Sequence, residues 1–139
     1  MDTQSIVTYK SAFDAIMHEI MADDGSQMEV WYARELQQVC GYARWENFQV
    51  AINRAKDSCN SQNINTDDHF RDVTKTIPMP KGAQKEIKDV LLTRYACYLI
   101  AQNGDPKKEE IAFAQSYFAV QTRRAELIAE RLQLQQRLE

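Results

Sequence analysis

The sequence predicts an α+β fold that is mostly helical, with a small β-sheet or hairpin and a long C-terminal helix. Apolar residues recur at helical spacing in several segments, and a run rich in β-branched residues lies near the middle of the chain. Neither Gly nor Pro occurs after Pro106, so nothing there stops a helix. The 139 residues, of which 44% are hydrophobic and 27% charged, are enough for one domain with a single core.

The N-terminal part is expected to form a helix followed by a strand. Residues 8–21 carry apolar side chains at helical spacing, and residues 23–26 have the Asp-Asp-Gly-Ser composition of a turn. The apolar positions are Phe13, Ile16, Met17, Ile20 and Met21. The segment Met28 to Tyr32 is short and rich in Val and aromatic residues, which predicts a strand.

Two short helices then follow with a glycine between them. Leu36, Val39 and Cys40 form the apolar stripe of the first, and Gly41 stands where a left-handed residue ends a helix. The second is expected over about residues 44–58, where Trp45, Phe48, Ile52 and Ala55 recur at helical spacing. This arrangement resembles a helix-turn-helix.

A β-hairpin is favoured after the polar loop of residues 60–69. Residues 70–77 are rich in β-branched side chains, and Pro78, Pro80 and Gly82 interrupt the chain directly afterwards. Residues 84–92 can return as the second strand. Their apolar spacing also allows a helix, so the hairpin is the favoured one of two interpretations.

The C-terminal third is expected to be helical. Thr93 can cap a helix that reaches Asn103 and ends at Gly104, and Asp105-Pro106 can start the next helix, which continues toward Glu139. We expect a domain over residues 1–122, and over 123–139 the start of an extended helix that leads to a missing C-terminal region. The apolar residues of that extension, suited to contact a partner or a second copy in a homodimer, are Leu127, Leu134 and Leu138.

The sequence offers no set of residues for catalysis. It shows no nucleophile elbow, no phosphate-binding glycine loop and no pair of histidines at metal-ligand spacing. Cys40, Cys59 and Cys97 are scattered and are expected to be buried thiols rather than disulfides or zinc ligands. We therefore expect no enzyme activity, no metal and no cofactor. The start of the chain lacks the pattern of a secretory signal, and no apolar run is long enough for a membrane span, which predicts a cytoplasmic protein.

Basic residues gather in two segments, although the whole chain has a net charge of −3. Residues 1–33 contain one Lys and six acids, whereas residues 34–56 contain four bases and two acids, and residues 73–94 contain five bases and two acids. Lys and Arg bind phosphates, and Arg, Asn and Gln can pair with base edges, so these segments indicate a nucleic-acid surface. Its expected residues are Arg44, Asn47, Asn53, Arg54, Lys56, Lys75, Lys81, Lys85 and Lys88.

Long runs of the sequence resemble the Bro-N domain, which is shared by phage antirepressors, baculovirus repeated-ORF proteins and certain bacterial proteins induced by DNA damage. These runs are WYARELQQVCGYARWENFQVAINRAKDSC, DHFRDVTKTI, KGAQKEIKD and LLTRYACYLIAQNGDPKKEEIAFAQSYFAVQTRRAELIAERL. The resemblance covers about residues 8–134. Pro78 and Pro80 depart from the usual pattern of the family, so contacts of the hairpin tip are not carried over.

The resemblance implies an α+β fold with a hairpin and a role in DNA binding. For the damage-inducible members it also implies expression under the SOS response and interaction with the bacterial strand-exchange recombinase on single-stranded DNA, which they restrain. Our first hypothesis is therefore a nucleoid-associated regulatory protein that binds DNA, single-stranded or duplex, or the recombinase filament. The alternative is a sequence-specific transcription regulator or antirepressor of prophage type.

Overall fold

The structure is a computed structural model that describes residues 1–119, and it confirms the α+β class. The elements, in chain order, are α1 (Thr3–Ala15), β1 (His18–Met21), β2 (Gln27–Tyr32), α2 (Ala33–Val39), α3 (Trp45–Ser61), β3 (Phe70–Pro78), β4 (Gln84–Thr93) and α4 (Arg94–Gln102). Short 3-10 turns lie at Thr66–Asp68 and Pro80–Gly82, and residues 109–119 form a last helix. The expected C-terminal extension, with Leu127, Leu134 and Leu138, lies outside the described residues.

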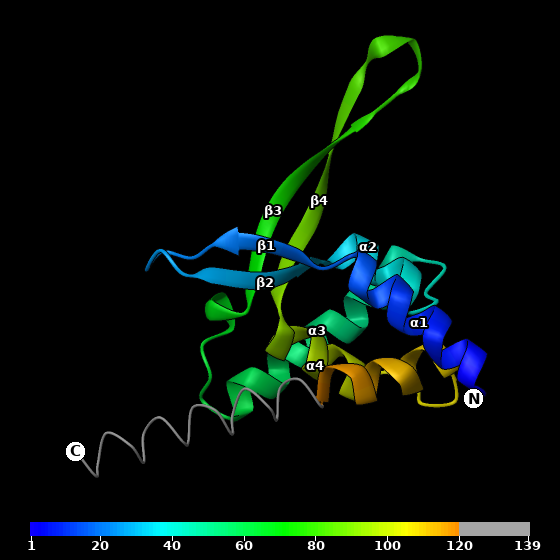
Figure 1. Cartoon of the computed structure of the whole chain (residues 1–139). Coiled ribbons are helices and arrows are strands. Elements are labelled where there is room, and N and C mark those ends of the chain that lie inside the picture. The colour runs from blue at the N-terminus through cyan, green and yellow to red at the C-terminus, as the bar shows by residue number, and fades with distance from the viewer. Residues whose placement is uncertain (120–139) are drawn as a thin grey trace.

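Two antiparallel hairpins make one four-stranded sheet in the order β1-β2-β4-β3. β1 pairs with β2 over four residues, and β3 pairs with β4 over nine, from Phe70–Leu92 to Pro78–Gln84. The two hairpins are joined only by the pairing of Val30–Tyr32 in β2 with Leu91–Thr93 in β4. The sheet is therefore narrow at its centre, and most of the β3–β4 hairpin extends beyond it (Figure 1).

The helices gather on one side of the sheet and enclose the core (Figure 1). Trp31 and Leu92 face them from the sheet, and Phe13, Phe48 and Phe118 come from three helices; all five are fully buried. Trp31 and Phe118 meet edge to face with ring centroids 5.3 Å apart, a favoured aromatic geometry. The three cysteines are buried free thiols, as predicted. Among the described helices, none has the length and apolar character needed to cross a bilayer.

The expected helix over residues 8–21 is wrong in its position. The helix starts earlier, where Asp2 caps it by accepting from the Ser5 N–H, and it ends at Ala15. Residues 18–21 are strand β1 instead, because the turn at residues 22–26 folds them back onto β2. The apolar spacing of Ile20 and Met21 fits both structures, and pairing with β2 decides between them.

The other predicted elements agree more closely with the structure. The strand near Met28, the helices on either side of Gly41 and the β3–β4 hairpin are present, although α3, with 17 residues, is not short. The helical alternative for residues 84–92 is excluded. Thr93 caps α4 as expected, since its hydroxyl oxygen accepts from the Ala96 N–H. The helix expected at Asp105-Pro106 begins only at residue 109, because the Asp105 side chain accepts from the Lys107 N–H and forms a turn there.

Candidate nucleic-acid interface

The outer part of the β3–β4 hairpin forms a projecting arm, defined here as residues 74–88. From Lys88 outward, β4 has no strand beside it except β3, because β2 ends at Tyr32. Five residue pairs, from Thr74–Lys88 to Pro78–Gln84, build the two strands of the arm. At about 3.4 Å per residue, the arm extends roughly 17 Å from its base. No residue of the arm is buried, and it stands clear of the helices (Figure 1).

The two faces of the arm differ in chemistry. Cross-strand partners share a face, so Lys75 lies opposite Ile87 and Ile77 lies opposite Lys85 on one of them. The other face carries the polar pairs Thr74–Lys88 and Thr76–Glu86. One face is thus amphipathic and cationic, and the other is polar.

Positive charge dominates the arm, which contains four lysines and one acid, Glu86. None of these lysines forms an ion pair with another described residue. The ammonium group of Lys75 lies 5.6 Å from the ring centre of Tyr32, and Lys81, Lys85 and Lys88 are exposed. An array of unpaired ammonium groups on a narrow projection is suited to bind phosphates along a nucleic-acid backbone.

A buried carboxylate fixes the base of the arm to α2. Asp89 Oδ1 accepts from the backbone N–H of Arg34, at 3.0 Å, and thereby caps the start of a helix that lies 55 residues earlier in the chain. The Arg34 side chain completes the link, since its Nε donates to the Lys88 carbonyl and its guanidinium stacks on Trp45 at 4.1 Å. The position of the arm is therefore set by α2 and by the first residue of α3.

The residues expected on α3 do not form one surface. Asn47 and Arg54 are both exposed and lie two helical turns apart on one flank. Lys56 lies on the opposite flank, where its ammonium group is 5.9 Å from the Phe70 ring centre. Arg44 and Asn53 are exposed at the start and in the middle of the helix. The structure thus brings Lys75, Lys81, Lys85 and Lys88 together on the arm but divides the α3 residues between two flanks of the helix.

Arg71 was missed by the sequence reasoning although it extends the cationic face. It is exposed on β3 and lies on the same face as Lys75, because residues four apart in a strand point to the same side. Counting every second residue back from Lys75 would have found it. Its backbone register places it at the base of the arm, opposite Leu91.

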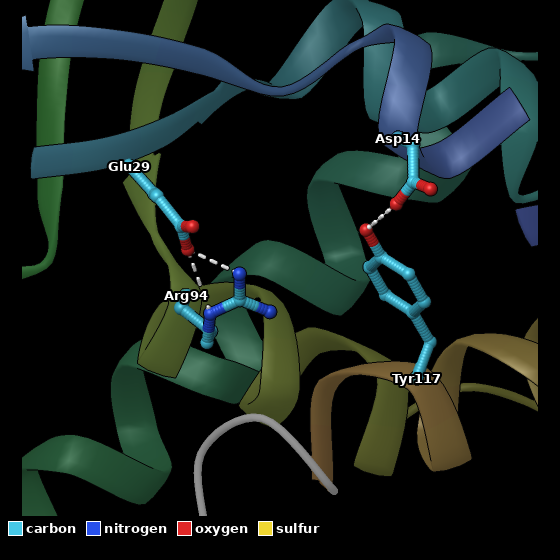
Figure 2. Close-up of polar contacts among 4 residues, drawn as sticks. All are labelled: Asp14, Glu29, Arg94 and Tyr117. Atoms are coloured by element: carbon cyan, nitrogen blue, oxygen red, sulfur yellow. Dashed lines mark hydrogen bonds and ion pairs between the residues drawn. The ribbon is translucent and has the colours of Figure 1, made fainter. Parts of the chain in front are cut away.

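Arg94, in contrast, was counted among the bases of the hairpin and does not contribute to the arm. Its guanidinium pairs with Glu29 (Figure 2). The same group lies 4.9 Å from the ring centre of the buried Trp31. Near it, the Tyr117 hydroxyl donates to Asp14 at 2.5 Å. Burial and this hydrogen bond to Asp14 both raise the pKa of Tyr117. The four side chains line a cavity of about 400 Å³ between α1, β2, the start of α4 and the last helix.

The histidines make local contacts. His18 Nε2 lies 2.8 Å from Glu35, and His69 Nδ1 lies 2.8 Å from the Thr93 hydroxyl. Burial lowers the pKa of His69. Over residues 1–119, no group of three His, Cys, Asp or Glu side chains is arranged to hold a metal ion.

Comparisons with known proteins identify the family. The model of the BRO family, N-terminal domain, matches residues 23–119. DNA damage-inducible protein D of Escherichia coli (strain K12) is 42% identical over 109 residues, which are 78% of this chain and 40% of that protein. The chain therefore spans less than half the length of that relative, and no solved structure matches it. Because the family model covers more than two thirds of the sequence, the chain belongs to the BRO family and contains its N-terminal domain.

Proposed function

We propose that this domain is the DNA-binding part of a regulator in a bacterial DNA-damage response. The observation that carries the proposal is the arm, with four unpaired lysines and one acid on residues 74–88. The name of the Escherichia coli relative, DNA damage-inducible protein D, supports the physiological setting. Binding, rather than catalysis, is the proposed activity, and neither a metal nor a cofactor is required for it.

In this proposal, the arm binds the nucleic-acid backbone through the positive charge of its lysines and through its length. Each lysine that neutralises a phosphate releases a condensed counterion, so affinity falls as salt rises. Ammonium groups on flexible stems follow a backbone without reading bases, which makes this contact independent of sequence. The amphipathic face suits single strands as well, because Ile77 and Ile87 offer apolar surface beside Lys75 and Lys85.

We further propose that the longer protein restrains strand exchange by engaging the recombinase filament on single-stranded DNA. The similarity to the damage-inducible relative supports this step. In this proposal the arm holds the DNA of the filament, and parts of the protein beyond this chain complete the contact. A homodimer formed through Leu127, Leu134 and Leu138 would place two arms on one filament.

The experiment compares two double variants that change the net charge equally. Lys81→Glu/Lys85→Glu alters the arm, and Lys10→Glu/Lys107→Glu alters exposed lysines elsewhere. Binding to single strand, duplex and recombinase-coated strand is measured at two salt concentrations. The arm variant is expected to lose affinity and to flatten the salt slope by roughly 1.8 on duplex, at about 0.9 per phosphate contact.

The control variant is expected to retain both the affinity and the slope within error. If both variants bind like the unaltered chain, the arm is not the contact and the proposal fails. Adding Mg²⁺ or Mn²⁺ to the same mixtures tests for cleavage, and cleavage that follows the protein would contradict a purely binding role. Strand-exchange assays with the arm variant then test the restraint of the recombinase.

A second function, sequence-specific regulation of prophage type, is favoured by one feature of α3. Asn47 and Arg54 are exposed on the same flank, and their amide and guanidinium groups can pair with adenine and guanine edges. Selection from a random duplex library decides between the two functions. A recovered consensus that Asn47→Ala weakens would establish specific readout, whereas unselective recovery would leave the arm-based function.

A further inference from the structure

The tip of the arm is built differently from its strands. Pro78 ends β3, Pro80 starts a 3-10 turn, and Met79 lies between them with 40% of its surface exposed. Lys81 and Gly82 have positive φ values of 66° and 77°, and they turn the chain back toward β4. The Met79 N–H donates to the Ala83 carbonyl at 2.8 Å and closes the loop. Two proline rings and this hydrogen bond make the tip stiff.

One segment of the tip, Pro78–Pro80, has no free backbone donor. Proline has no N–H, and the one N–H between the two prolines is already bonded to Ala83. An N–H that loses water without gaining a partner costs free energy, so this segment can enter an apolar environment more cheaply than an ordinary turn. Its side chains are also apolar, and none of the three can read a base edge.

A lysine-bearing arm whose tip carries the apolar, donor-free segment Pro78–Pro80 is suited to deform duplex DNA. Minor-groove proteins insert Met, Pro and similar side chains between base pairs, which unstacks one step and kinks the duplex by about 20–90°. We propose that Met79, held by Pro78 and Pro80, acts as such a wedge while the arm lysines hold the flanking phosphates. This inference rests on the proposed DNA binding and adds DNA bending to it.

The length of the arm agrees with this arrangement. The minor groove of straight duplex DNA is about 7.5 Å deep and only about 6 Å wide, so the two-stranded arm enters where the kink opens the groove. The arm extends roughly 17 Å from its base, so the tip reaches the floor of the groove while the helices stay outside the duplex. Unstacking costs a few kcal/mol per step, and the contacts that the bent duplex gains along the arm offset it. Steps that kink easily, such as TA, are expected to be the preferred sites.

The test uses the whole chain and a duplex of about 30 base pairs with a central TA step. Fluorescent dyes at the two ends report bending by energy transfer, and 2-aminopurine at the central step reports unstacking. The unaltered chain is expected to raise both signals. Met79→Ala is expected to abolish both and to weaken binding about tenfold without changing the salt slope, because no charge is removed.

Met28→Ala is the matched control. Met28 is exposed to a similar extent, 37%, on the other hairpin, and its replacement is expected to leave bending, unstacking and affinity unchanged. If the unaltered chain binds without bending, or if Met79→Ala bends DNA as well as the unaltered chain, the wedge is wrong and DNA binding by the arm still holds. If the unaltered chain does not bind duplex or single strand, the proposed function fails as well.

Discussion

The two halves of the β3–β4 hairpin share their strands but not their surroundings. In the base, Phe70, Val90 and Leu92 are buried against the helices, and Asp89 is buried beside α2. In the arm, which is residues 74–88, no side chain is buried and lysines predominate. One pair of strands therefore supplies stability at one end and a proposed binding surface at the other. Substitutions in the base should change folding, whereas substitutions in the arm should change binding.

The largest contrast is expected from removing an aliphatic side chain at each end of β4. Leu92→Ala creates a cavity in the core and should lower the free energy of unfolding by about 2–5 kcal/mol. Ile87→Ala changes a half-buried position of the arm and should cost less than about 1 kcal/mol. Urea unfolding measures both. Equal losses of stability would show that Ile87 contributes as much to packing as Leu92. The hairpin would then not be divided into a buried base and an exposed arm.

A smaller contrast is expected from two aspartates of the same hairpin. Asp89→Ala removes the cap of α2 and leaves the Arg34 N–H without its acceptor, so it should cost about 1–3 kcal/mol. Asp72 is exposed on β3, and Asp72→Ala should stay within about 0.5 kcal/mol. Asp89→Asn retains an acceptor oxygen and should recover part of the loss. Thermal unfolding ranks the stabilities of the three variants. If Asp89→Ala is as stable as the unaltered chain, the bond from the Arg34 N–H to Asp89 does not anchor the arm.

The smallest contrast comes from one substitution made at two threonines. Thr93→Val removes the cap of α4 and the bond to His69, and should cost about 1 kcal/mol. Thr76→Val lies on the exposed polar face of the arm, where a β-branched apolar residue also suits a strand, so stability should stay within about 0.5 kcal/mol. Chemical unfolding curves compare the two. A greater loss of stability for Thr76→Val than for Thr93→Val would contradict the assignment of the stabilising contacts to the base of the hairpin.

Much of the fold could be predicted from local signals in the sequence. The β-branched run before Pro78 and Pro80 indicated the hairpin, and Thr93 indicated the start of α4, because both depend on neighbouring residues. Strand β1 could not be separated from the preceding helix in this way. Its four residues become a strand only because β2 lies beside them, and spacing alone does not reveal a partner.

For the candidate site, too, local features could be predicted and contacts between distant residues could not. The arm lysines could be predicted because four of them fall within 15 residues. That they project could not, because the projection depends on where β2 ends. The anchor between Asp89 and Arg34 joins residues 55 positions apart, and neither has a sequence signal for this role. The pairing of Arg94 with Glu29 likewise joins residues 65 positions apart and has no sequence signal.

The anchor at the base of the arm also determines where a mechanical load would travel. A sideways push on the tip acts on a lever roughly 17 Å long, with its fulcrum at the Val73–Asp89 pair. Asp89 and the Lys88 carbonyl are the groups that hold Arg34, which in turn rests on Trp45. Torque from a bound partner would thus act on the joint between α2 and α3 as well as on Val90, the next residue of β4, which belongs to the buried core.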